Sequence, residues 1–251
     1  MRTQIIGLGT VGRAQAHLLH KLNHEVHAYD VQAKKPPKYV NFITKPHSNV
    51  NINFICTPEA QVENAIQNLV KNHVQGLYVV KSSTPPGTTK LLSEKYHVHI
   101  CHNPEFLRKK YAFQDVENPS RIIIGQCCPK HGRLLAGLYK PLNKPIYVTE
   151  PTISELVKLT GNALRATVIT FWNEIHELAA ALRLNTREVA DLVDQVQTIG
   201  TWEGGQWGTR FFGKSYGGCL PKDVDQLINI FQQHGLSPTL FQAIKIFNEK
   251  L

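Results

Sequence analysis

The stretch Gln4-Ile5-Ile6-Gly7-Leu8-Gly9-Thr10-Val11-Gly12 decides the fold, because it joins a short apolar strand to a helix through a G-x-G-x-x-G motif. A second apolar strand ends in Asp30, at the distance that dinucleotide-binding units require. Gly7 permits the tight turn, Gly9 lets the backbone approach a pyrophosphate, and Gly12 lets the helix pack on the strand. The alternative is an ordinary strand–helix turn, but the spacing of strand, glycines and acid favours a dinucleotide site.

The same segment predicts which dinucleotide is bound. The first helical amides, including those of Thr10 and Val11, would face the phosphates. Asp30 would accept hydrogen bonds from both ribose hydroxyls and repel a 2′-phosphate, which favours NAD over NADP. The loop at residues 34–38 is rich in lysine and proline and reads as exposed surface, in which Lys35 is placed to cover the adenosine end.

Further apolar strands at residues 52–56, 77–80 and 98–101 alternate with helical stretches, and strands at 121–124 and 145–148 follow. This alternation predicts an α/β domain over residues 1–150, built as a Rossmann-like, doubly wound parallel sheet. Ligands collect at the carboxyl ends of such strands. The polar residues that follow three of these strands are Thr57 and Pro58, Ser83 and Thr84, and Asn103, Pro104 and Glu105.

After residue 150 the pattern becomes helical. Apolar residues from Ile153 to Leu182 describe one long amphipathic helix, and shorter helices are expected at residues 188–196, from Pro221, and at 238–250. Residues 151–251 are therefore expected to form a smaller all-helical domain built on the long helix. On that helix Lys158 and Asn162 lie one turn apart and share a face with Glu155. That face is either a solvated surface or the wall of a cleft.

The stretch from Gly213 to Asp223 places Cys219 just before a helix that Pro221 is suited to begin. The positive end of a helix favours thiolate, the nucleophilic form of cysteine. Gly217 and Gly218 leave room for a ligand, and Asp223 lies one turn on, within reach of a water near the sulfur. The alternative is a small buried cysteine. Three further residues either contact phosphate groups of a ligand or are ordinary surface residues. They are Arg210, which lies just upstream of this stretch, and Lys214 and Tyr216, which lie within it.

Composition excludes several classes of protein. The chain has 251 residues and a formal net charge of +9, but its lysines and arginines are scattered and no nucleic-acid-binding motif is present, so a small anion is the expected partner. The five cysteines show no zinc-ligand spacing, which predicts a reducing cytoplasm and no metal. Apolar runs are too short for a membrane span, and the first residues are expected to enter a strand rather than a secretory signal.

Taken together, the motifs resemble the UDP-glucose/GDP-mannose dehydrogenase family over nearly the whole chain. Those that match in order are the glycine motif with Asp30, residues 81–88 (KSSTPPGT), residues 103–108 (NPEFLR), residues 119–125 (PSRIIIG), Glu155 with Lys158 and Asn162, Phe171 with Asn173 and Glu174, and residues 217–223 (GGCLPKD).

The resemblance implies a two-step, four-electron oxidation of a sugar C6 alcohol to a carboxylate with two NAD⁺, through a thiohemiacetal and a thioester on Cys219. It implies that Lys158 and Asn162 stabilise the oxyanion, that Asp223 positions water and that Glu105 acts as acid and base. Ser83 stands in place of a family threonine and keeps its hydroxyl. The substrate implied is a nucleotide sugar, UDP-glucose foremost.

The resemblance also assigns binding residues and a partner. Phe106, Leu107 and Arg108 correspond to backbone that cradles the sugar nucleotide, while Lys109 and Lys222 are placed near the cofactor. Lys109 stands where the family usually has a glutamate, which reverses a charge. The long helix is expected to pair with its counterpart in a homodimer. The family's third, nucleotide-binding domain has no counterpart in these residues. Three expectations follow: a separate chain supplies it, the substrate is held by fewer contacts, or the substrate is no longer a nucleotide sugar.

Two other functions fit parts of the pattern. One is an NAD-binding protein without catalysis, for example a partner subunit, which would be indifferent to the loss of Cys219. The other is a dehydrogenase for a smaller hydroxy acid, which would use Lys158 and Asn162 without covalent chemistry. Replacing Cys219 by alanine distinguishes both functions from a thioester route, because only that route requires the thiol.

Overall fold

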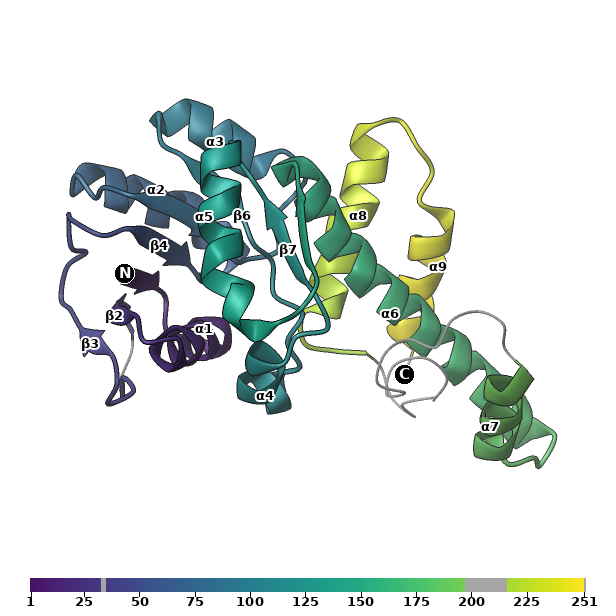
Figure 1. The fold of residues 1–251 in the computed structure, drawn as a ribbon. Coiled ribbons are helices and arrows are strands. Elements are labelled where there is room, and N and C mark those ends of the chain that lie inside the picture. The colour runs from purple at the N-terminus through teal and green to yellow at the C-terminus, as the bar shows by residue number, and fades with distance from the viewer. Residues whose placement is uncertain (33–34, 197–215, 251) are drawn as a thin grey trace. The chain divides into compact units, whose positions relative to one another are not determined.

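The computed structural model describes residues 1–32, 35–196 and 216–250, and it divides the chain into two compact units, Met1–Lys158 and Leu159–Leu251. The boundary falls within the long helix α6 (Pro151–Ala181), so the first two turns of that helix belong to the first unit (Figure 1). No helix within the described ranges combines the length and the apolar character that a bilayer crossing requires.

The first unit contains an eight-stranded sheet in the order β3-β2-β1-β4-β5-β6-β7-β8. Its strands are β1 (Arg2–Ile6), β2 (Glu25–Tyr29), β3 (Asn41–Phe42), β4 (Ile52–Ile55), β5 (Leu77–Val80), β6 (Ile100–His102), β7 (Ile122–Gly125) and β8 (Ile146–Thr149). All neighbouring strands are parallel except β6 and β7. The α/β, Rossmann-like fold is thus confirmed, with one antiparallel pair that the alternation of strands and helices does not reveal.

Helices cover both faces of this sheet (Figure 1). They are α1 (Thr10–Lys21), α2 (Val62–Lys71), α3 (Thr88–Tyr96), α4 (Ala112–Glu117) and α5 (Pro129–Tyr139), with three short 3₁₀ turns, η1 (Glu59–Gln61), η2 (Lys109–Tyr111) and η3 (Lys140–Leu142). Consecutive strand residues enter different cores: Ile5 and Val79 pack with α1 and α5, whereas Ile6 and Val80 pack with α2 and α3. Burial on both faces explains why the strands read as continuous apolar runs.

The strand β7 runs opposite to β6. The segment that joins them contains the six-residue helix α4. β7 starts beyond the end of β6 and runs back beside it, so that Gly125 pairs with His102.

This pairing brings α6 to the carboxyl edge of the sheet. The last residue of β8, Thr149, pairs with Gly125, which is level with the end of β6, and α6 begins two residues later at Pro151. A side chain at Gly125 would have its Cβ 2.6 Å from the Cα of Pro151, so only glycine permits this approach. The first turns of α6 therefore lie beside the loops that follow β5 and β6.

The described residues of the second unit form the remainder of α6 with α7 (Thr186–Val196), α8 (Leu220–Gln233) and α9 (Thr239–Asn248). Its core joins Ala166 and Ile169 of α6 to Val224 and Ile228 of α8 and Ile244 of α9. The apolar spacing predicted for α8 is confirmed, because Val224, Leu227 and Ile228 are buried. The helix begins one residue earlier than expected, at Leu220, so that Pro221 is its second residue and Cys219 its N-cap.

Helix α6 has two faces rather than one. Its buried side includes Leu159, Ala163, Ala166 and Ile169 together with several polar residues. The apolar stripe that the sequence shows from Ile153 onward points outward instead, and Leu164, Phe171 and Leu178, spaced by seven residues, are 42%, 52% and 57% exposed. The long helix is thus confirmed, and its outer apolar stripe is left without a cover in the described part of the chain.

The close packing of α1 on the first strand predicts a test of the glycine motif. In Gly12→Ala the new Cβ would lie 1.8 Å from the carbonyl oxygen of Gly7, so we expect a loss of about 1–3 kcal/mol in the free energy of unfolding. Urea denaturation of the apo protein measures it.

The matched control is Gly137→Ala, also within a helix, where the added Cβ has no heavy atom within 4 Å. This variant should gain up to about 1 kcal/mol because alanine is the better helix former. Equal effects of the two substitutions would contradict the packing described for Gly12.

Candidate active site

The glycine motif adopts the conformation that a dinucleotide site requires. Gly7 has φ +94°, and a Cβ there would lie 3.0 Å from the carbonyl oxygen of Cys56. Gly9 faces open space, with nothing within 4 Å of a Cβ built on it. The first hydrogen bond of α1 runs from the Arg13 N–H to the Gly9 oxygen at 3.0 Å, so the preceding amides, those of Thr10, Val11 and Gly12, have no helical acceptor. The open backbone and these amides fit a pyrophosphate.

Asp30 holds the glycine loop from the end of β2. Its Oδ2 accepts from the Leu8 N–H at 2.6 Å and its Oδ1 from the Gln32 N–H at 2.6 Å. Each carboxylate oxygen retains a second lone pair, which fits the two hydroxyls of a ribose. Arg13 donates to the carbonyl oxygen of Lys35 at 2.8 Å, so the loop that carries Lys35 is tied to α1 by its backbone.

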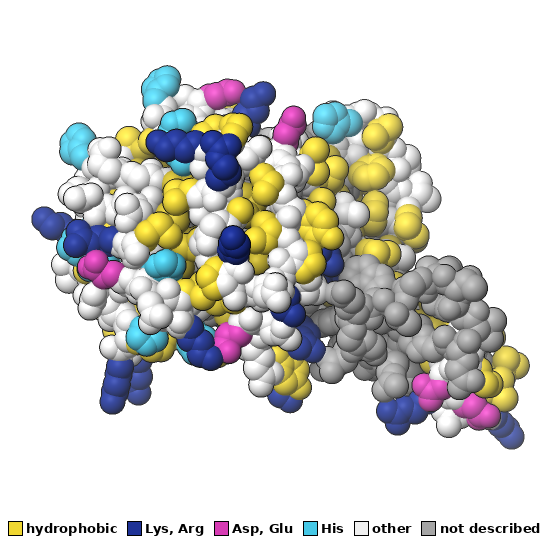
Figure 2. Space-filling model, in the orientation of Figure 1, with side chains coloured by type: hydrophobic (Ala, Val, Ile, Leu, Met, Phe, Trp, Pro, Cys, Tyr) yellow, Lys and Arg dark blue, Asp and Glu magenta, His cyan; other side chains and the backbone are white. Residues whose placement is uncertain are grey.

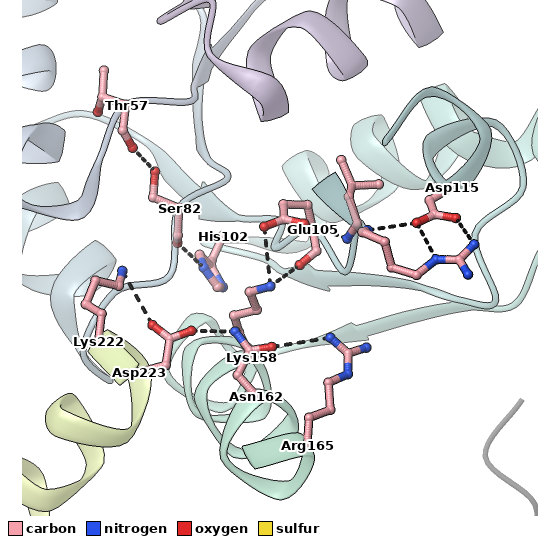
Figure 3. A network of polar contacts seen from close by, with 12 residues as sticks. Thr57, Ser82, His102, Glu105, Asp115, Lys158, Asn162, Arg165, Lys222 and Asp223 are labelled. Atoms are coloured by element: carbon pink, nitrogen blue, oxygen red, sulfur yellow. Dashed lines mark hydrogen bonds and ion pairs between the residues drawn. The ribbon is translucent and has the colours of Figure 1, made fainter. Parts of the chain in front are cut away.

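The loops after β4 and β5 are joined at the same edge. The Ser82 hydroxyl donates to the carbonyl oxygen of Thr57 at 2.5 Å, and Pro58 caps the short η1 turn (Figure 3). Ser83 is half-buried beside Thr84, which is fully buried with its Oγ1 3.4 Å from the Glu155 carboxylate. The polar residues expected at this edge therefore lie there.

His102, at the end of β6, is a buried residue that motif matching did not single out. Its Nε2 lies 3.1 Å from the Ser82 carbonyl oxygen, which can only accept, so Nε2 carries the proton (Figure 3). Its Nδ1 then accepts from the Ser154 hydroxyl of α6 at 2.8 Å. Burial lowers the pKa of His102 to about 3, so the ring is neutral and links the loop after β5 to α6.

Lys158 points from α6 into the loop that follows β6. Its Nζ donates to the Glu105 carbonyl oxygen at 2.5 Å and lies 3.4 Å from the Glu105 carboxylate, while only 5% of the side chain is exposed (Figure 3). Two cations lie near the Phe106 ring, with Lys158 Nζ 5.1 Å and Arg121 Cζ 5.2 Å from its centroid. Arg121 reaches this edge because β7 begins there, a placement that the sequence pattern did not indicate.

Two carboxylates, those of Glu105 and Asp115, hold the backbone of the next residues of the loop. The Glu105 carboxylate accepts from the Leu107 N–H at 2.6 Å. The Arg108 guanidinium forms two bonds with Asp115, at 2.7 and 3.1 Å, and the Arg108 N–H donates to the same carboxylate at 2.8 Å. That ion pair raises the pKa of Arg108 and occupies its side chain. Lys109, in η2, is exposed.

In the second unit, the catalytic cysteine expected from the motif and its neighbours form a separate group. Cys219 is exposed at the N-cap of α8, and its carbonyl oxygen accepts from the Asp223 N–H at 3.2 Å. The Asp223 carboxylate is fully buried, accepts from the Asn162 amide and lies 3.4 Å from Lys222 Nζ (Figure 3). Arg165 in turn donates to the Asn162 oxygen at 3.4 Å.

The residues just before Cys219 divide into two groups. Gly217 and Gly218 are exposed and face open space, as expected for a place where a ligand approaches. Tyr216, expected at the substrate, instead packs in the core of the second unit with its N–H donating to Asn248 at 2.6 Å, because its large apolar ring is better buried than solvated. Arg210 and Lys214 lie outside the described residues.

Glu155, which shares a face with Lys158 in the sequence pattern, caps a helix. Its carboxylate accepts from the N–H groups of Gly87 and Thr89, at 2.6 and 2.8 Å, at the start of α3. A carboxylate at a helix N-terminus satisfies amides that lack a helical acceptor. Burial raises the pKa of Glu155, and these hydrogen bonds oppose that shift. The capping acid comes from a helix 66 residues further along the chain, so no local signal marks it.

A buried lysine, Lys81, joins the loops that follow β5 and β6. Lys81 donates to the Asn103 side-chain oxygen at 2.8 Å, and the Tyr139 hydroxyl donates to the same oxygen at 2.6 Å. Asn103 donates in turn to the Ile123 carbonyl oxygen at 2.7 Å. Burial lowers the pKa of Lys81 to about 8. The lysine and asparagine of the two matched motifs thus hold the loops after β5 and β6 in place.

Comparison with known proteins resolves which family shares this arrangement. Residues 41–143 match the NAD binding domain of the UDP-glucose/GDP-mannose dehydrogenase family, and residues 152–250 match its central domain. A UDP-glucose 6-dehydrogenase of Campylobacter jejuni is 30% identical over 99% of this chain and 72% of its own length. The chain belongs to the UDP-glucose/GDP-mannose dehydrogenase family. The matched NAD binding domain assigns the dinucleotide as NAD.

Other relatives of this family member differ in length and substrate. The UDP-glucose 6-dehydrogenase YwqF of Bacillus subtilis is 28% identical over 92% of this chain, which spans 62% of that relative. A GDP-mannose 6-dehydrogenase of Pseudomonas aeruginosa is 28% identical over 90% of this chain, which spans 63% of it. The solved structure of a UDP-glucose dehydrogenase from Pyrobaculum islandicum has a TM-score of 0.89 at 27% identity, over 99% of this chain and 68% of that one.

The neutral His102 predicts a specific acid sensitivity. Its pKa of about 3 in the native state is below the ordinary value of 6.5, so the unfolded chain binds the proton first as the pH falls. The stabilising contribution is complete above pH 6.5 and is lost toward pH 3. Between pH 6 and 4 we expect this residue to reduce the free energy of unfolding by roughly 1 kcal/mol per pH unit.

Urea denaturation of the wild type and of His102→Gln across this pH range measures the effect. The amide of glutamine keeps a donor and an acceptor but does not titrate, so the variant should show the shallower pH dependence. The same slope in both proteins, or titration of the His102 ring between pH 5 and 7 by NMR, would contradict the assignment.

Proposed function

We propose that this chain is an NAD-dependent nucleotide-sugar 6-dehydrogenase that oxidises a C6 alcohol to the carboxylate in two steps. The observation that carries the proposal is the pairing of each oxyanion candidate with an acid. Lys158 contacts Glu105 and Asn162 contacts Asp223, while Asp223 lies one turn after the exposed Cys219. These four partners and the cysteine are the groups that a thioester route needs.

NAD would be held by the open glycine loop, by the first amides of α1, by Asp30 and by the loops after β4 and β5. When bound, NAD⁺ supplies the hydride acceptor for both oxidations. Ser83, Thr84 and Thr57 line the expected nicotinamide side of this edge, and Lys222 and Lys109 carry positive charge that suits its phosphates. Lys35 would cover the adenosine end.

Cys219 would act as the nucleophile after the first oxidation. Its sulfur adds to the aldehyde carbon, and the carbonyl oxygen takes up a proton to give a thiohemiacetal. Oxidation of that carbon removes a hydride and a proton and leaves a thioester. Water then attacks the thioester carbon, the carbon–sulfur bond breaks, and the carboxylate product and the cysteine are released. The exposed position of Cys219 at the start of α8 suits this role.

Lys158 and Asn162 would stabilise the oxygen that becomes negative in each addition. They lie four residues apart on the continuous α6 and so project from one side of it. An ammonium and an amide are both donors, and such donors act most strongly where water is excluded. Lys158 is 4% and Asn162 3% exposed, so both are shielded from bulk water.

The two acids would divide the work of hydrolysis. Glu105 already contacts the Lys158 ammonium and would take the proton from the attacking water. Asp223 would hold that water, because it is buried beside Asn162 and one turn from the sulfur. Since Arg108 is engaged by Asp115, the contribution of residues 106–108 to the substrate would come from their backbone and from the Phe106 ring.

UDP-glucose is the substrate we favour, since the relative that matches 99% of this chain at 30% identity and the solved structure with a TM-score of 0.89 are both UDP-glucose dehydrogenases. The purified protein should form two NADH per UDP-glucose consumed, and the matched panel is GDP-mannose and the UDP-N-acetyl sugars. NADH absorbance together with product mass measures both the stoichiometry and the sugar. One NADH per sugar, or no turnover while NAD⁺ still binds, would contradict the four-electron reaction.

The cysteine route is tested within the same assay. In Cys219→Ala no thioester forms, so turnover to the carboxylate should fall by about 10³-fold or more while NAD⁺ binding is unchanged. The matched control is Ser237→Ala, a change of similar size at an exposed residue of the same unit. Full activity of Cys219→Ala would instead support a hydroxy-acid type of dehydrogenase that uses Lys158 and Asn162 alone.

A homodimer is the proposed assembly. The exposed stripe of Leu164, Phe171 and Leu178, with Val168 and Ile175 between them, has the spacing of a helix–helix seam. We expect a dimer at micromolar concentration by analytical ultracentrifugation, and a monomer for Phe171→Glu, because a buried charge opposes association. Leu236→Glu, equally exposed but outside α6, should remain dimeric. A monomeric wild type would contradict the seam.

A further inference from the structure

Four metal-ligating side chains converge beside the start of β6, away from the groups discussed above. The ligand atoms of His99, Cys127, Cys128 and His131 all lie within 4.8 Å of one another. His131 Nδ1 is 3.3 Å from the sulfur of Cys127 and 3.3 Å from that of Cys128. His99 Nδ1 is 3.9 Å from the Cys127 sulfur. Among the residues that the structure describes, this is the one cluster of this kind.

The antiparallel pairing of β6 and β7 creates the cluster. His99 directly precedes β6, whereas Cys127 and Cys128 follow the end of β7. In a wholly parallel sheet these segments would lie at opposite edges, but here the end of one strand meets the start of the other. Cys128 is the N-cap of α5 and His131 lies in the first turn of that helix, so the three ligands from Cys127 to His131 are on one side of the helix start.

The distances suit one tetrahedral metal ion. Zinc bonds of about 2.3 Å to sulfur and about 2.0 Å to nitrogen place neighbouring ligand atoms roughly 3.3–3.8 Å apart. The measured sulfur–nitrogen separations of 3.3, 3.3 and 3.9 Å are close to this range. We propose that His99, Cys127, Cys128 and His131 bind one zinc ion in a site with two nitrogen and two sulfur ligands.

The donor set decides the metal and the kind of site. Two thiolates and two imidazoles in a tetrahedral arrangement select zinc over the harder ions, which take oxygen ligands. Four protein ligands leave no open position, which is the mark of a structural rather than a catalytic zinc. His99 is exposed and the other three ligands are half-buried, so an ion has a path from solvent.

Cys101 supports the site from behind. It is fully buried in β6, its sulfur is 3.6 Å from that of Cys127, and it accepts from the Cys127 N–H at 3.4 Å. A thiol there would donate to the Cys127 thiolate and orient it, as outer-shell partners do at metal sites. The competing use of the same pair is a disulfide between Cys101 and Cys127, which would exclude the metal.

Bound zinc would join three segments at one point: the start of β6, the end of β7 and the start of α5. Its expected effect is on stability, because an ion that binds only the folded chain raises the melting temperature in proportion to the logarithm of its concentration. The zinc ligands lie at the opposite end of β6 from His102, so the ion has no part in the proposed oxidation.

Cobalt titration of the reduced, chelator-treated full chain tests the site. One Co²⁺ per chain should give the intense visible bands of tetrahedral cobalt and a thiolate charge-transfer band in the near ultraviolet, and one equivalent of Zn²⁺ should abolish both. Cys128→Ser and His131→Ala should each lose these bands. Cys219→Ser and His234→Ala, which remove the same side chains elsewhere, should keep them. Circular dichroism checks that each variant is folded.

Three results would overturn the proposal. The first is the absence of tetrahedral cobalt bands in the folded, reduced wild type. The second is a cobalt spectrum that survives in folded Cys128→Ser and His131→Ala, which would mean that the ion binds elsewhere. The third is a Cys101–Cys127 disulfide, found by mass spectrometry of protein purified under reducing conditions. A zinc-dependent rise in melting temperature in the wild type, absent from both ligand variants, would support it further.

Discussion

The staggered, antiparallel pairing of His102 with Gly125 is the constraint on which the rest of the first unit depends. It places the end of β7, and through β8 the start of α6, level with the carboxyl edge of the parallel strands. Ser154, Glu155 and Lys158 then reach His102, the start of α3 and Glu105 within two turns of one helix. If β7 instead ran back along the full length of β6, α6 would begin at the other edge, and these contacts would not form.

The first turns of α6 carry buried polar groups, and each has a defined partner. A buried carboxylate or ammonium is costly unless hydrogen bonds replace its hydration. Glu155 obtains them from backbone amides, whereas Lys158 obtains them from a carbonyl oxygen and a carboxylate. The helix amides that Glu155 satisfies are bonded whatever ligand is present. Lys158 and Glu105 instead satisfy each other, and so can exchange that contact for a substrate oxygen or a water.

Local sequence signals predicted the glycine loop, Asp30, most strands, the long helix and the cysteine at a helix start, because each depends on residues close in the chain. They did not predict the direction of β7, since hydrophobic patterns report which face of a strand is buried and not which way it runs. For the same reason the sequence did not predict the positions of Arg121 and His102 or the capping role of Glu155, which depend on contacts between distant segments. The burial of Tyr216 was not predicted either, because its motif position indicated a ligand whereas its ring packs in a hydrophobic core.

Helix α6 carries two sets of residues, one polar and one apolar, whose relative direction around the helix axis is fixed by the number of residues between them. Glu155 and Lys158 face the loops of the first unit, and the apolar stripe of Leu164, Phe171 and Leu178 faces outward. Inserting or deleting one residue between Lys158 and Leu164 would rotate one pattern against the other by about 100°. Seven residues restore the phase to within about 20°. Over evolution this helix is therefore expected to change length by close to whole numbers of turns, such as seven or eleven residues.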